Sequence, residues 1–321
     1  MDSQKTIARI PPEIFSAIFS LVPNGDHSLN VTRGLWPLGR VCSFWCSILL
    51  SDPILWTHLN ISGSLPASTP VQQDYLCSRY PWRPQVLSEY LSRSANLSLY
   101  VTIDHAHKSV GSDLNVKMFY QTLYAQSHRF ASLSHCTSET MRMSTLPDVF
   151  DFPNLRHLTI TLPASFAFYL FSTPTLETCC ISFDDSPPLS LNQPPPVQCP
   201  TNLRELILKG RATALSNVPI DAFKLATAPL TSLTINDLVL SPSIIQTLPQ
   251  VQNLSITTRR ICTKESMSSL IQLIEHRLDC GIMRHATFSG YIYEHYDLVF
   301  WGRIDALNAR KEVTFTLTSF K

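Results

Sequence analysis

A short apolar pattern, Leu-x-x-Leu-x-Ile, recurs through the second half of the chain. Its copies begin at Leu155, Leu176, Leu203, Leu230, Val251 and Met283. Side chains alternate along a strand, so the fourth and sixth positions of each copy point to the same side. One copy cannot bury its apolar side alone, whereas stacked copies can. The pattern therefore predicts a solenoid whose strands form a parallel sheet.

The period of these copies is similar to that of leucine-rich repeats, which span about 20–29 residues. A degraded earlier copy is expected at Phe130 and Leu133. The Asn or Cys usual three residues after the last motif position is missing, and these places hold Pro163, Asp184, Arg211, Leu238 and Arg259. Backbone groups at the turns must therefore find other hydrogen-bond partners, because buried polar groups are nearly always paired.

The first sixty residues show helical rather than strand periodicity. Pro11 and Pro12 suit the first turn of a helix whose apolar face holds Ile14, Phe15, Ile18, Phe19 and Val22. A second helix is expected to begin near Pro37 and to align Leu38, Val41, Cys42, Trp45 and Leu49. Asp52 then reads as the N-cap of a short turn, with Pro53 at its first position, that presents Leu55 and Trp56.

This N-terminal segment carries more apolar helix surface than sixty residues can bury in a core of their own. Buried aromatic and aliphatic anchors are typical of protein interfaces. The candidate interface residues are Ile10, Pro11, Pro12, Ile14, Phe15, Ile18, Leu38, Val41, Cys42, Trp45, Leu49, Leu55 and Trp56. The alternative for each is an ordinary place in the segment's own core, and Trp45 and Trp56 could serve either purpose.

Changes in composition and in the periodicity of apolar residues divide the sequence into three regions, with expected bounds 1–61, 62–135 and 136–321. The middle region is a join with a helical stripe from Val86 to Leu91, a strand near residues 97–103 and a helix between Leu114 and Arg129. The last region should end in a helix near Tyr296–Ala309 and a strand at Val313–Leu317. The proline-rich stretch 186–200 is expected to be a stiff return loop, with a polyproline recognition element as the alternative.

The composition excludes several partner classes. A formal net charge of +1 with 15% charged residues argues against capture of nucleic acid, which needs clustered Lys and Arg. No apolar run approaches the roughly 18 residues of a membrane span. Nine cysteines without a regular spacing, and a start without an apolar segment, predict reduced thiols and a cytoplasmic or nuclear location.

Signals for catalysis are weak. The sequence contains no Gly-rich phosphate-binding loop and no Cys pairs with the spacing of a zinc site. His105 and His107 are expected to be a surface pair rather than metal ligands. We therefore expect no cofactor and no enzymatic activity, with a hydrolase whose site is invisible in one sequence as a competing hypothesis.

With these motifs in view, the chain resembles F-box-like proteins with C-terminal leucine-rich repeats, of a type common in fungi. The match lies in Ile10–Ile14 with Ile18-Phe19, in Leu38–Trp45, and in Leu55-Trp56. The resemblance implies an α/β fold, with a small helical F-box domain followed by an irregular repeat solenoid. It also implies docking on the Skp-type adaptor of a cullin ubiquitin ligase, with the repeats as receptor for a protein substrate. The alternative is a repeat-based interaction scaffold that acts without a ligase.

The residues between the inward positions of the repeats form the candidate substrate face. They include His157, Thr159, Glu205, Ile207, Lys209, Thr234, Asn236, Asn253, Ser255 and His285. This face is small, polar and nearly uncharged, so it should not select strongly acidic or basic partners. The alternative is a solvated sheet surface that is rich in Thr because Thr suits strands.

Overall fold

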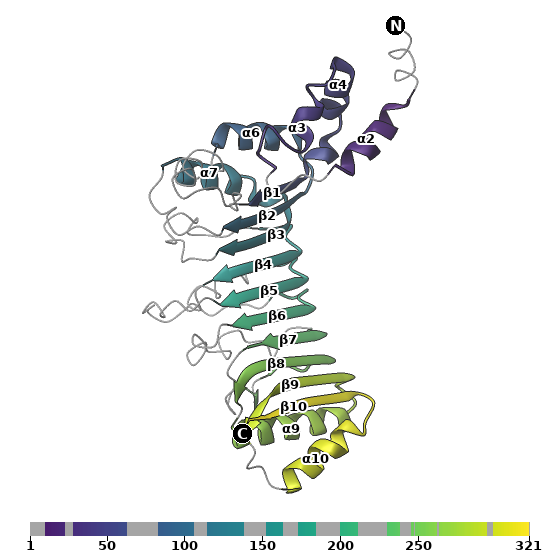
Figure 1. The fold of residues 1–321 in the computed structure, drawn as a ribbon, viewed down its shortest axis with the longest axis vertical. Coiled ribbons are helices and arrows are strands. Elements are labelled where there is room, and N and C mark those ends of the chain that lie inside the picture. The colour runs from purple at the N-terminus through teal and green to yellow at the C-terminus, as the bar shows by residue number, and fades with distance from the viewer. Residues whose placement is uncertain are drawn as a thin grey trace. The chain divides into compact units, whose positions relative to one another are not determined.

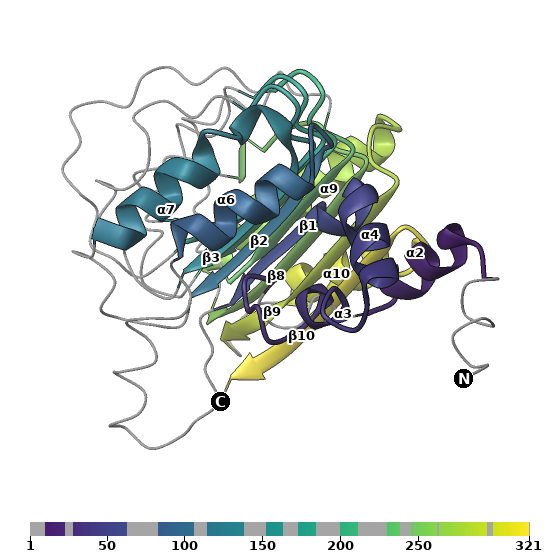
Figure 2. The same cartoon turned by 90° about the horizontal axis from the view of Figure 1, so that it is seen from above.

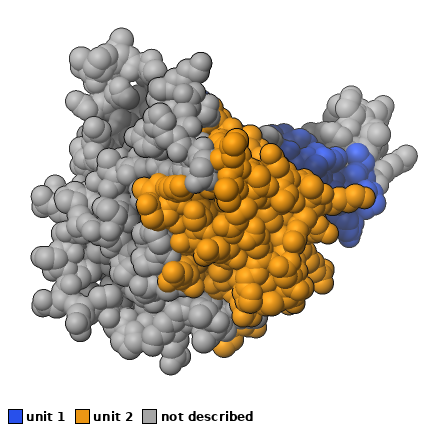
Figure 3. All heavy atoms as spheres, turned by 90° about the horizontal axis from the view of Figure 1, so that it is seen from below, with its two compact units in different colours: residues 1–148 blue, residues 149–321 orange. Residues whose placement is uncertain are grey.

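The structure is a computed structural model of the 321-residue chain. It describes residues 10–22, 28–62, 83–105, 114–137, 152–162, 173–183, 200–210, 230–237, 245–246, 248–261, 263–293 and 298–320. The proline-rich residues 187–196 and His107 lie outside these ranges. The chain divides into two compact units, residues 1–148 and 149–321 (Figure 3).

Unit 1 begins with short helices. They are α2 (Pro12–Ser20), α3 (Leu35–Leu38), α4 (Ser43–Ser51) and the 3₁₀ helix η1 (Pro53–Trp56). Pro12 occupies the first turn of α2, where its missing N–H has no partner to lose. The predicted cap of η1 is confirmed, since the side chain of Asp52 accepts a hydrogen bond of 3.1 Å from the Ile54 N–H.

The expected single helix from Pro37 to Leu49 is wrong. Helix α3 ends at Leu38, and the chain turns through Gly39 and Arg40 before α4 begins at Ser43. Cys42, the N-cap of α4, is fully extended (φ −161°, ψ 165°), which no helix interior allows. The apolar spacing across this segment therefore belongs to two separate helices.

The rest of unit 1 alternates strands and helices. The elements are β1 (His58–Ser62), α6 (Pro84–Arg93), β2 (Leu99–His105), α7 (Leu114–Tyr124), η2 (Ser127–Arg129) and β3 (Phe130–Thr137). The three strands are parallel and paired in chain order. Helices α6 and α7 run side by side along one face of this sheet (Figure 2). The helical stripe near Leu87, the strand near Val101 and the helix from Leu114 are confirmed.

The described residues of unit 2 form seven parallel strands that follow one another in chain order (Figure 1). They are β4 (His157–Leu162), β5 (Thr178–Phe183), β6 (Glu205–Gly210), β7 (Ser232–Asn236), β8 (Asn253–Ile261), β9 (His285–Tyr293) and β10 (Val313–Phe320). Helix α9 (Lys264–Asp279) follows β8, and α10 (Leu298–Asn308) follows β9 and packs on both α9 and β10. The predicted final helix and strand are confirmed.

The repeated motif determines the register of this sheet. The fourth positions, Leu158, Cys179, Leu206, Leu233, Leu254 and Ala286, are aligned across neighbouring strands. The sixth positions are aligned in the same way, and the first, fourth and sixth positions of all six copies are buried. Phe130 and Leu133, the degraded copy, are buried as well. The parallel sheet and its inward face were therefore predictable from the sequence.

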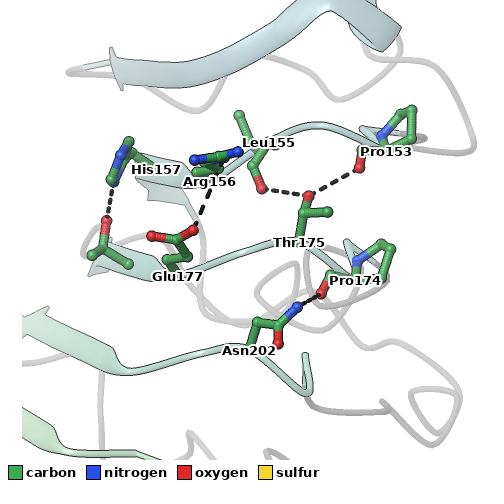
Figure 4. A network of polar contacts seen from close by, with 9 residues as sticks. Pro153, Leu155, Arg156, His157, Pro174, Thr175, Glu177 and Asn202 are labelled. Carbon is green, nitrogen blue, oxygen red and sulfur yellow. Dashed lines mark hydrogen bonds and ion pairs between the residues drawn. The ribbon is translucent and has the colours of Figure 1, made fainter.

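Hydrogen bonds between consecutive copies join the segments that lead into the strands. The Thr175 hydroxyl lies 2.9 Å from both the Pro153 and the Leu155 carbonyl oxygens, and the Asn202 side chain donates to the Pro174 carbonyl at 3.0 Å (Figure 4). The Arg156 carbonyl accepts from two consecutive backbone N–H groups of the next copy, at 2.9 and 3.0 Å. Backbone N–H groups and short polar side chains thus provide hydrogen-bond donors for the carbonyl groups just before the strands.

Strands β1 and β10 each have a residue whose backbone groups hydrogen-bond to one residue outside the sheet of the same unit. In unit 1, Ser28 accepts from the Asn60 N–H through its hydroxyl and donates its own N–H to the Asn60 carbonyl. In unit 2, the Asn308 amide accepts from the Phe315 N–H at 2.7 Å and donates to the Phe315 carbonyl at 3.4 Å. An unpaired strand edge is a template for association with another chain, so these contacts protect β1 and β10.

Candidate functional site: an exposed apolar surface at the N-terminal helices

Aromatic side chains hold α2 against α4. Phe15 lies 5.5 Å from Phe44 with the rings edge to face, and Phe19 lies 5.2 Å from Trp45 in a similar arrangement. Such ring pairs are favourable beyond the apolar area that they bury. Phe15 and Phe19 are buried, whereas Phe44 and Trp45 are half-buried. These four residues form the local core, and they fix which side of α2 faces inward.

The neighbouring stripe of α2 faces solvent. Ile14 and Ile18 are 51% and 48% exposed, and Leu21, at the end of the helix, is 81% exposed. Residues at i, i+4 and i+7 lie on one helix face, so these side chains form a continuous apolar stripe. Ile10, just before the helix, is 38% exposed and continues the spacing by one turn.

The following elements add further exposed apolar residues. Val41 precedes α4, Leu50 lies in its last turn and Ile54 lies in η1, and all three are more than half exposed. Of the twelve large hydrophobic residues that are exposed in the described part of the chain, seven therefore fall between Ile10 and Ile54. Helix α4 has no charged residue, and α2 has only Glu13. This concentration of exposed apolar residues makes the N-terminal helices a candidate interaction surface.

The candidate interface residues divide into three groups by exposure. Phe15, Leu49, Leu55 and Trp56 are buried in unit 1 and present no surface to a partner. Leu38 and Trp45 are half-buried. The exposed ones are Ile10, Pro11, Pro12, Ile14, Ile18, Val41 and Cys42. Sequence analysis missed Leu21, Leu50 and Ile54, although each extends an apolar run that was already visible in the sequence.

The second candidate site is the outward side of the strands in unit 2. No candidate substrate-face residue is buried: His157, Lys209, Asn253 and His285 are exposed, and Thr159, Glu205, Ile207, Thr234, Asn236 and Ser255 are half-buried. Parallel pairing aligns them in rows across the strands, for example Thr159, Cys180, Ile207, Thr234 and Ser255. The described face is thus a surface of short, mostly uncharged side chains at strand spacing.

The described residues contain no group of three or more His, Cys, Asp or Glu side chains that could hold a metal ion. No helix among them is long and apolar enough to cross a membrane. The two surfaces differ in chemistry, since the first consists of exposed apolar side chains and the second of short, mostly uncharged polar ones.

Comparison with known families bears on the first surface. Residues 7–62 match the F-box-like family model, and this range includes all of α2, α3, α4, η1 and β1. No curated protein and no solved structure matches the chain significantly. The exposed apolar surface therefore lies within the matched range, and residues 7–62 are an F-box-like domain.

Proposed function

We propose that this chain is the substrate receptor of a Skp–cullin–F-box ubiquitin ligase. Its F-box-like domain docks on a Skp-type adaptor, and its repeat unit binds a protein substrate. The observation that carries the proposal is the exposed apolar surface around Ile14 and Ile18, inside the matched residues 7–62. Exposed apolar patches on folded proteins often mark sites where a partner binds.

The size of the exposed groups supports a docking role. Full burial of an Ile side chain is worth about 1.5–3 kcal/mol, and about half of Ile14 and of Ile18 remains exposed. Covering both would contribute about 2 kcal/mol, which corresponds to roughly 30-fold in affinity. The near absence of charge on α2 and α4 supports an apolar partner surface and an affinity that depends little on salt.

The receptor role of unit 2 is proposed from its repeats. The aligned inward positions support a leucine-rich-repeat-like solenoid, and such solenoids present extended binding surfaces. The outward rows around Thr159 and Thr234 would contact the substrate. This surface favours an uncharged polar protein partner over a strongly acidic or basic one.

The mechanism would be proximity. One end of the chain holds the ligase and the other holds the target, so the effective concentration of the target near the recruited enzyme rises. In this proposal the chain itself makes and breaks no bond, and it needs no cofactor. Its place of action would be the cytoplasm or the nucleus, where cullin ligases operate.

The test is capture of the full chain by a purified Skp-type adaptor. An Ile14→Asp, Ile18→Asp double variant should lose capture, because a carboxylate would be buried without a partner. Leu298→Asp, Val299→Asp is a matched control, since these residues are 89% and 74% exposed on α10 in unit 2. Trp45 is a poorer choice because it belongs to the aromatic core of the domain.

Each outcome has a clear meaning. Capture of the wild type and of the α10 control, but not of the α2 variant, supports docking through this surface. Failure of the folded wild type to bind would contradict the ligase role and favour a scaffold that works without a ligase. Equal capture of the α2 variant would place the docking surface elsewhere on the chain.

A further inference from the structure

Helix α6 lies outside the F-box-like residues 7–62, yet it supplies two side chains to that domain. The Tyr90 ring lies 5.3 Å from the Trp56 ring, and the Trp36 ring lies 5.2 Å from the Trp56 ring. Both pairs of rings are arranged edge to face. The Arg93 guanidinium carbon lies 4.5 Å from the centre of the Trp36 ring and 4.6 Å from that of Trp56. We call these four residues the tryptophan cluster.

The tryptophan cluster is well packed and specific in its geometry. Trp56 is completely buried and Tyr90 is 1% exposed. The Tyr90 hydroxyl donates to the His58 carbonyl at 2.6 Å, and Arg93 is further held by Glu89 at 2.9 Å. A planar guanidinium can lie against two indole rings at once, which the compact ammonium group of Lys cannot do equally well.

The tryptophan cluster holds α3, α4 and η1 in place, and α4 and η1 carry part of the exposed apolar surface. The Trp56 indole N–H donates to the Leu49 carbonyl at 2.8 Å, which ties η1 to α4. Ile54 is two residues before Trp56, and Leu50 directly follows Leu49, so both exposed side chains depend on this link. Trp36 anchors α3 in the same way, because its N–H donates to the Ser28 carbonyl at 2.8 Å.

We infer that Arg93 and Tyr90 are positioning residues for adaptor docking, although neither belongs to the exposed surface itself. The inference rests on the proposed function. Without Arg93, the two indole rings lose the guanidinium that α6 places over both of them. Helix α4 and η1 then leave their docking-competent arrangement for part of the time. The apparent dissociation constant then rises in inverse proportion to the competent fraction.

The experiment compares variants of the full chain by calorimetric titration with a purified Skp-type adaptor. Arg93→Ala should weaken binding by about 10-fold, as expected if the competent fraction falls to about one tenth. Arg93→Lys should restore part of the affinity, because Lys keeps the charge and the aliphatic stem. Arg303→Ala is the matched control, since Arg303 is a partly buried arginine paired with Glu275 in unit 2, and it should bind like the wild type.

Hydrogen exchange of the same variants supplies a readout that does not need the adaptor. In Arg93→Ala, exchange should accelerate in residues 35–56, while β2 and β3 keep their wild-type protection. Uniform acceleration throughout unit 1 would overturn the inference, because Arg93 would then support the unit as a whole. Binding of Arg93→Ala as tight as that of Arg303→Ala would overturn it as well.

The two measurements separate this inference from the proposed function. If the wild type does not bind the adaptor, the proposed function fails, and exchange in residues 35–56 still tests whether Arg93 holds the domain. Unchanged exchange there in Arg93→Ala would overturn the positioning role. Selective acceleration would support it.

Discussion

We expect His135 to make the stability of unit 1 depend on pH. It lies at an inward position of β3, where the register aligns it with Ile103, and it is 4% exposed. Its Nε2 atom has no hydrogen-bond partner within the described part of the chain. Burial lowers the pKa of His135 from its usual 6.5 to about 4, because the charged imidazolium would lose its hydration.

The sign and size of the effect follow from the two pKa values. The unfolded chain takes up a proton near pH 6.5, whereas the folded chain does so only near pH 4, so acidification favours the unfolded state. The loss begins below about pH 6.5. By about pH 4 this one group should lower the free energy of unfolding by about 3 kcal/mol, at 1.36 kcal/mol for each pKa unit.

A His135→Leu variant tests this reasoning. Leu is an apolar side chain like that of the neighbouring Ile103, so it suits this buried position. The substitution also removes a buried nitrogen that has no hydrogen-bond partner among the described residues. Near neutral pH the variant should therefore be at least as stable as the wild type. Between about pH 7 and pH 4 it should lose about 3 kcal/mol less than the wild type. The measurement is urea unfolding of the full chain at both pH values, followed by pulsed hydrogen exchange in β2 and β3.

The same substitution at the exposed His285, on a strand of unit 2, is a matched control and should leave hydrogen exchange in β2 and β3 as in the wild type. The reasoning would be refuted if His135→Leu lost as much stability on acidification as the wild type. It would also be refuted if the variant were strongly destabilised near neutral pH, because His135 would then make a contact that Leu cannot replace.

Three further predictions concern contacts in unit 2. Arg277→Met should lower the free energy of unfolding by about 3 kcal/mol in urea titrations, because two buried backbone carbonyl groups lose a charged donor. Asn308→Ala should uncover the backbone of Phe315 and cause concentration-dependent association in analytical ultracentrifugation; a variant that sediments like the wild type at every concentration would contradict this. Thr175→Val keeps the side-chain shape but removes a hydroxyl that contacts two carbonyl groups, so thermal unfolding should report a loss of about 1–2 kcal/mol.

Sequence periodicity was sufficient to predict the parallel strands of unit 2 and their inward positions, although it did not predict helix α9. Each copy of the motif puts apolar residues at alternate positions of one strand, and this local rule also decides which side is buried. That is why Leu206 and Leu208 could be assigned to the core and Lys209 to the surface from the sequence alone. The hydrogen bonds of Thr175 and Asn202 could not be assigned in this way, because their acceptors lie in a neighbouring copy about 20–28 residues away.

Periodicity was less informative in the N-terminal helices. Helix α2 is apolar over a wide arc, so its sequence does not tell which part of that arc is covered. Phe44 and Trp45, some 30 residues later, pack on Phe15 and Phe19, and this contact leaves Ile14 and Ile18 facing solvent. The apolar segment could therefore be recognised from the sequence, whereas which of its side chains are exposed could not.

The sequence by itself thus determined the helical N-terminal segment, the parallel strands and the absence of strong charge from the candidate surfaces, because these depend on local spacing and composition. Only the tertiary structure decided that Trp56 lies in the core, that α6 packs on Trp56, and that His135 is buried with its Nε2 atom unpaired within the described residues. Each of these depends on side chains from distant parts of the chain meeting in space, and no local pattern of residues encodes such a meeting.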